Sequence, residues 1–98
     1  MIKIKINKDT KINEIIIDGH SGYDVEGKDI VCAGVSSIVI TSINAMLRIN
    51  NEALTFEKKS GYMKITFLKH NEMIDMLIDN MLDLLKQMEE QYKNYIEI

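Results

Sequence analysis

Cysteine, proline and tryptophan are scarce in this chain of 98 residues, which has one cysteine and neither of the other two. A single cysteine excludes an internal disulfide and a zinc site built from several thiolates. This low cysteine content is typical of a reducing compartment, so it predicts a cytoplasmic protein. We expect no metal ion and no other cofactor.

Long hydrophobic runs and strong charge are also missing. No uninterrupted apolar run reaches the roughly 18 residues that suggest a membrane span. From Ile2 to Ile6 isoleucine alternates with lysine, which predicts a strand rather than a signal peptide. The formal net charge of −3 gives no general footprint for nucleic acid. We therefore expect neither a membrane nor a nucleic acid as a direct partner.

The spacing of the apolar residues predicts a single domain over residues 1–98. A first hairpin is predicted from the alternation in residues 2–7 and the β-branched run in residues 12–18, and a second over residues 53–68 with its turn at Ser60-Gly61. Helical spacing predicts helices over residues 29–50 and 72–96. The expected fold class is two-layer α+β, with about four mostly antiparallel strands in two hairpins and two helices packed on the sheet.

Three expectations concern packing and exposure. The consecutive isoleucines of residues 15–17 predict that both faces of their strand are covered. Apolar residues on more than one side of the first helix predict a helix buried nearly all round, with a second subunit of a homodimer over the side that the sheet does not reach. His70, at a junction beside the predicted N-cap Asn71, is expected to face solvent.

Residues that could carry chemistry gather between the first hairpin and the first helix. One cysteine with a histidine elsewhere in the chain is the sequence form of a thiol nucleophile and its base. Asp29 is a natural N-cap, which places Cys32 at about the third helical residue, where free N–H groups and the helix dipole favour an anion. This position favours a reactive thiolate, whereas the alternative is a small buried hydrophobic residue.

The polar loop from Gly19 to Lys28 is longer than most connections between a strand and a helix. It is predicted to be a mobile substrate lid with His20 at its root, and the alternative is a plain connection. The loop has neither the Gly-Lys-Ser/Thr ending of a phosphate loop nor a dinucleotide fingerprint. Tyr23 could stack on a substrate side chain or cover the helix end.

The sequence Gly-His-Ser-Gly-Tyr at residues 19–23, followed by Gly-Lys-Asp-Ile-Val-Cys-Ala at residues 27–33 and a Val-Ser pair, resembles the ribosomal-processing cysteine protease family called Prp. The predicted order of strands and helices extends this resemblance over the whole chain. It implies a small dimeric α+β protease that removes a short N-terminal extension from large-subunit ribosomal protein twenty-seven, cutting after a phenylalanine. Ser21 and Gly34 stand where alanine is more usual.

The resemblance implies a role for each residue of the motif. The implied base is His20 and the implied nucleophile is Cys32; the supporting positions are Gly19, Asp29 and Ser36, and the substrate loop holds Ser21, Gly22, Tyr23 and Gly27. Asp29 could orient His20 or hold the loop against the helix. Ser36, one turn after Cys32, could bond the thiolate or substrate, or bond back to the Cys32 carbonyl.

The predicted function is that of a cysteine endopeptidase that removes the N-terminal extension of the ribosomal protein, cutting after an aromatic residue. A Cys-His dyad would form an acyl-enzyme, with backbone N–H groups around the helix start stabilising the oxyanion. One alternative is a non-catalytic, dimeric, ribosome-associated module that binds protein. Another is a redox-sensing thiol, which would need Cys32 but not His20.

Overall fold

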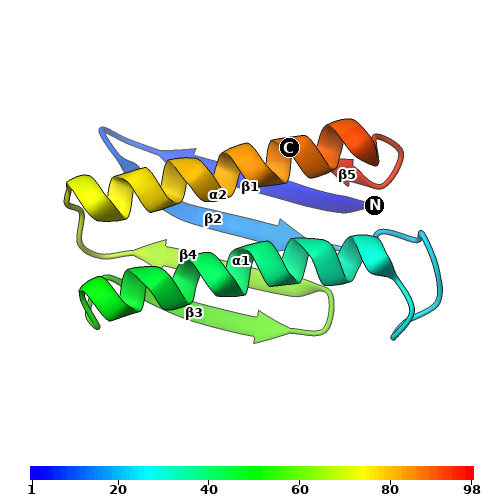
Figure 1. Ribbon diagram of the computed structural model, residues 1–98, viewed down its shortest axis with the longest axis horizontal. Helices are drawn as coiled ribbons and strands as arrows, with labels where there is room; N and C mark the ends of the chain where they lie inside the picture. The colour runs from blue at the N-terminus through cyan, green and yellow to red at the C-terminus, as the bar shows by residue number, and fades with distance from the viewer.

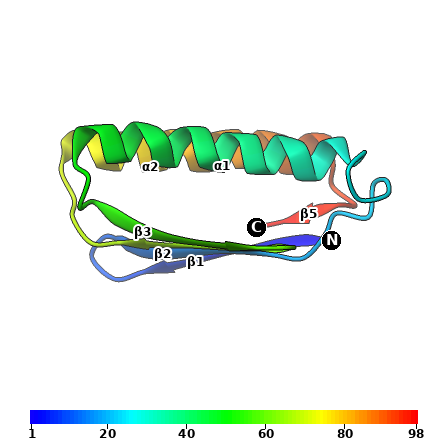
Figure 2. The same ribbon diagram turned by 90° about the horizontal axis from the view of Figure 1, so that it is seen from below.

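A computed structural model describes residues 1–98 as one sheet with two helices on one of its faces (Figures 1 and 2). The elements in chain order are β1 (Ile2–Lys8), β2 (Ile12–Asp18), α1 (Ile30–Ile49), β3 (Leu54–Lys59), β4 (Tyr62–Phe67), α2 (Glu72–Gln91) and β5 (Ile96–Glu97). The strand order is β3-β4-β2-β1-β5, and every pair is antiparallel except β1 with β5. The predicted α+β class is confirmed, but the sheet is mixed and has a fifth strand.

The fifth strand lies where the sequence predicted the end of the second helix. Helix α2 stops at Gln91, with Tyr92 as its C-cap. The chain then turns back so that the amide of Ile2 donates to the carbonyl of Tyr95 at 2.8 Å and Ile96 pairs with Ile2. Ile96 is only 1% exposed. Burial of this isoleucine beside β1 therefore outweighs the helical spacing.

The face of the sheet away from the helices is bare (Figure 2), so the prediction that both faces of β2 are covered is wrong. Ile15 and Ile17 point into the core, while Ile16 is half-buried on the bare face. In the strand register, Ile16 lies between Lys5 of β1 and Lys64 of β4. Lysine stems can cover an apolar neighbour while their amino groups stay in water.

Within the single chain, helix α1 is buried along one stripe, which leaves its outward side for the predicted second subunit. Its buried residues are Val31, Val35, Val39, Ser42, Ile43 and Met46. They recur at steps of three and four, as expected for one helix face on a core. By length and composition alone α1 could also cross a membrane, with a mean hydropathy of 2.0, but the core helix of a soluble protein passes the same test.

Gly34 lies where α1 and α2 approach each other closely. A Cβ atom at this position would be 2.8 Å from Cε of Met88 on α2. The glycine that stands where alanine is more usual therefore has a packing reason. Its missing side chain makes room for the methionine.

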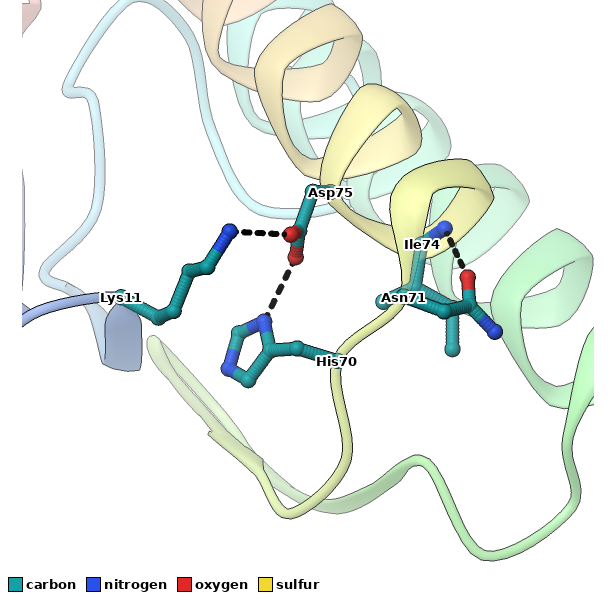
Figure 3. Close-up of polar contacts among 5 residues, drawn as sticks. All are labelled: Lys11, His70, Asn71, Ile74 and Asp75. Carbon is teal, nitrogen blue, oxygen red and sulfur yellow. Dashed lines mark hydrogen bonds and ion pairs between the residues drawn. The ribbon is translucent and has the colours of Figure 1, made fainter.

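A charged cluster ties the chain together at the end of the sheet opposite the loop that precedes α1 (Figures 1 and 3). Asp75 on α2 lies 2.8 Å from Nζ of Lys11 and 2.6 Å from Nδ1 of His70. The side chain of His70 is only 21% exposed because it packs against Asp75, so the expectation that it faces solvent is wrong. Asn71 caps α2 as predicted, accepting from the amide of Ile74 at 2.9 Å.

These contacts shift the titration of both charged partners. The hydrogen bond from Lys11, together with the hydrogen bond with His70, lowers the pKa of Asp75 below its ordinary 3.8. The hydrogen bond and charge of Asp75 raise the pKa of Lys11 above 10.5. The cluster therefore stabilises the fold while Asp75 is ionised and Lys11 is protonated.

Replacement of Asp75 by asparagine is expected to lower Tm by about 4–8 °C near neutral pH, the shift for a part-buried hydrogen bond worth on the order of 1 kcal/mol. Because the pKa of Asp75 is lowered, its contribution to the stability of the fold is fully present above pH 3.8 and is lost as the pH falls. Because the pKa of Lys11 is raised, its contribution to the stability of the fold is fully present below pH 10.5 and is lost at higher pH. Thermal unfolding across pH would contradict this account if the wild-type and Asp75→Asn curves stayed equally far apart at acid pH.

Candidate active site

The N-cap of helix α1 is Asp29, as the sequence predicted. Its Oδ1 atom accepts hydrogen bonds from the amides of Val31 and Cys32, both at 3.0 Å. Its own carbonyl accepts from the amide of Ala33 at 3.1 Å. Cys32 is therefore the third residue of the helix, and its side chain is half-buried.

This capping also corrects the expected oxyanion site. The amides of Val31, Cys32 and Ala33 are already engaged with Asp29. An N-cap carboxylate satisfies the N–H groups that a helix start would otherwise offer to a ligand. The first turn of α1 thus has few free donors left for an oxyanion.

The second carboxylate oxygen of Asp29 holds the preceding loop against the helix. Oδ2 accepts hydrogen bonds from the hydroxyl of Ser21, from the amide of Tyr23 at 3.2 Å and from the amide of Asp24 at 3.3 Å. No hydrogen bond joins Asp29 to His20. Of the two roles considered for Asp29, the structure supports holding the loop.

The surroundings of Asp29 decide its ionisation. Burial raises the pKa of this carboxyl, but hydrogen bonds from the Ser21 hydroxyl and from the amides of Cys32, Asp24 and Val31 outweigh burial and lower the pKa to about 2. Each of these donors favours the charged form. Asp29 is thus a carboxylate at neutral pH.

Ser21 links the loop to the cysteine. Its amide lies 3.4 Å from Sγ of Cys32 and donates to it, and the residue is only 3% exposed. A hydrogen bond to sulfur strengthens when the sulfur becomes a thiolate, because the acceptor then carries a charge. The residue that departs from the usual alanine therefore bonds to Asp29 through its hydroxyl and to Cys32 through its amide.

His20 follows the end of β2 and is exposed. The carbonyl of His20 accepts from the N-terminal ammonium group of Met1 at 2.6 Å, and the amide of Gly19 donates to the carbonyl of Gly61 at 2.8 Å. These contacts fix the backbone on both sides of the histidine. The imidazole itself has no hydrogen-bond partner in the chain.

Two cavities bring His20, Cys32 and Ser36 together. One, of about 390 Å³, is bounded by the loop and the start of α1, and it also reaches Gly22, Gly27 and Asp29. The other, of about 180 Å³, extends from Gly19 to the β3–β4 turn. The hydroxyl of Ser36 makes no hydrogen bond back to Cys32. Most of the residues that the motif singled out thus surround one thiol.

Tyr23 lines neither of the two cavities. Its ring packs edge-on against Tyr92, which ends α2, and Tyr95, with centroids 5.8 and 5.3 Å away. Edge-to-face aromatic pairs at such distances are favourable. The sequence did not indicate this cluster because it predicted both tyrosines inside the helix. Tyr23 therefore anchors the loop to the end of α2.

A half-buried thiol at the start of a helix, sharing two cavities with a histidine, fits a cysteine-dependent hydrolase. The profile of the family described as cysteine protease Prp matches residues 1–97. The chain belongs to this family of cysteine proteases.

Individual proteins show the same similarity. The ribosomal processing cysteine protease Prp of Staphylococcus aureus is 29% identical over 100 residues, covering 99% of this chain and 94% of that protein. A crystal structure of Prp from S. aureus with a covalently linked product peptide has a TM-score of 0.89 at 30% identity, covering 99% of this chain and 96% of that one. A second, with a substrate peptide, has a TM-score of 0.83 at 29% identity with the same coverage.

Replacement of Ser21 by alanine, the more usual residue, is expected to raise the pKa of Asp29 from about 2 towards 3.8, because it removes one of the donors that lower it. A carboxyl whose pKa is lowered by folding stabilises the fold above its unfolded pKa, and this stabilisation is lost as the pH falls. Wild type should therefore be more stable than the variant near neutral pH, by about 1–2 kcal/mol. The difference should shrink as the pH falls from 3.8 to about 2.

Urea unfolding at several pH values and carbon-detected NMR titration of the Asp29 carboxyl measure these two effects. An unchanged pKa of Asp29 in Ser21→Ala would show that the hydroxyl does not stabilise the carboxylate. Thr41→Ala is a suitable control because Thr41 is an exposed hydroxyl residue on α1 with no hydrogen bond to Asp29.

Proposed function

We propose that this protein is a cytoplasmic cysteine endopeptidase that removes the N-terminal extension of large-subunit ribosomal protein twenty-seven, cutting after an aromatic residue. The observation that carries the proposal is the shared position of Cys32 and His20 on two cavities, with the Ser21 amide at the sulfur. The S. aureus relative is named for ribosomal processing and has been crystallised with a substrate peptide.

In the proposed mechanism, Sγ of Cys32 attacks the carbonyl carbon of the scissile bond while His20 takes the thiol proton. The tetrahedral intermediate collapses as His20 passes this proton to the leaving amine, which leaves an acyl-enzyme. Water then attacks the thioester, His20 takes its proton, and the thiol is restored with release of the carboxylic acid. A covalently linked product peptide in the S. aureus structure fits nucleophilic catalysis.

The oxyanion needs N–H donors that are not engaged elsewhere. Because Asp29 occupies the amides at the start of α1, the loop is the better source. The Ser21 amide is engaged with the sulfur, but the amide of Gly22, which lines the larger cavity, makes no hydrogen bond within the chain. We assign oxyanion stabilisation to this part of the loop, and to Ser36 a contact with the substrate.

Replacement of either Cys32 or His20 by alanine is expected to abolish cleavage of a synthetic peptide that spans the junction between the extension and the mature ribosomal protein. Loss of a general base alone costs roughly 10²–10⁴-fold in rate. Mass spectrometry of the products, after incubation with purified enzyme, locates the cut. It should follow an aromatic residue.

His70→Ala is the matched control, because this histidine lies in the charged cluster with Asp75 at the other end of the sheet. It should retain the cleavage rate. Wild-type protein that is folded and binds the peptide without cutting it would instead indicate a binding module. Peroxide-sensitive activity that needs Cys32 but survives in His20→Ala would indicate a redox sensor.

We also propose a homodimer formed through the outward side of α1. Ile30 is 55% exposed, and Ile40, although half-buried, does not pack on the core. Size-exclusion chromatography with light scattering should give twice the chain mass of 11.3 kDa. Ile40→Glu should give a monomer, because a carboxylate would be desolvated in the interface. A wild-type mass of one chain at all concentrations would overturn this proposal.

A further inference from the structure

A catalytic histidine must be held in one orientation, and in many hydrolases a carboxylate does this. Here the imidazole of His20 has no hydrogen-bond partner within the chain. Three carboxylates share the cavities with His20, those of Asp24, Glu26 and Asp29, and none of them bonds to its ring. Asp29 uses both oxygens on Ser21 and on backbone amides. Within the chain, packing is therefore the contact that remains to orient the His20 ring.

The surface on which the ring packs is the turn between β3 and β4. A Cβ atom placed on Gly61 would lie 2.6 Å from Nε2 of His20, 3.0 Å from Cε1 and 3.1 Å from Cδ2. These three atoms form the far edge of the imidazole. Any side chain at residue 61 would thus force the ring to move.

The position of this turn is fixed relative to the end of β2. Tyr62 pairs with Asp18 of β2 on one side and with Lys59 of β3 on the other. The amide of Gly19 donates to the carbonyl of Gly61 at 2.8 Å. Gly61 itself has φ +67°, a conformation that glycine adopts without strain. The strand pairing therefore places the backbone of Gly61, which carries no side chain, next to the ring of His20.

We propose that Gly61 is a positioning residue for the proposed general base: its missing side chain lets the β3–β4 turn support the imidazole of His20. This inference rests on the proposed function, since it assumes that His20 acts on Cys32. Gly61 has no chemical role of its own and acts through the ring that lies on it.

Two substitutions separate the collision from backbone strain. Alanine at residue 61 adds a Cβ and disfavours a positive φ, whereas asparagine adds the same Cβ but tolerates this conformation better. We expect kcat to fall by about 100-fold in both Gly61→Ala and Gly61→Asn, the cost of misplacing a catalytic group by about 1 Å. KM for the junction peptide should change much less. Wild-type kcat in Gly61→Asn would overturn the proposal.

A thermal double-mutant cycle tests the contact without any substrate. Gly61→Ala should lower Tm more when His20 is present than in the His20→Ala background, where the ring that collides with the new Cβ is gone. Equal shifts in the two backgrounds would show that the turn does not support the ring. If wild type cleaves no peptide, the proposed function fails, while this cycle still reports whether Gly61 supports His20.

Discussion

The carboxylate of Asp29 is the group on which the active-site end of this structure depends. One of its oxygens caps α1 and so makes Cys32 the third helical residue, while the other holds Ser21, Tyr23 and Asp24. A single ionised group therefore sets both the start of the helix and the path of the loop. With a pKa of about 2, it keeps its charge at any pH at which the protein is expected to work.

Features that depend on residues close together in the chain could be predicted. The alternation in β1, the caps Asp29 and Asn71 and the turn at Ser60-Gly61 are set by a few neighbouring residues each, and all are confirmed. The short strand β5 and the half-exposed Ile16 could not be predicted, because each depends on which strand lies beside it. Burial of Ile96 against β1 is a tertiary contact that helical spacing does not reveal.

The candidate site shows the same division. The motif indicated His20, Cys32 and Ser36, and the structure places all three on the same cavities. Their contacts were not predictable from spacing. Gly61 lies far from the motif in sequence and reaches His20 only because β4 pairs with β2.

The hydrogen bond from the Ser21 amide to Cys32 Sγ has a consequence for the population of working molecules. If the loop were to lift from α1, the sulfur would lose this donor, because the Ser21 amide belongs to the loop. In the proposed mechanism, only molecules with the loop docked would be ready for chemistry, and the apparent activity would scale with their fraction. Local undocking of the loop would then lower the activity at temperatures where the rest of the fold is still intact.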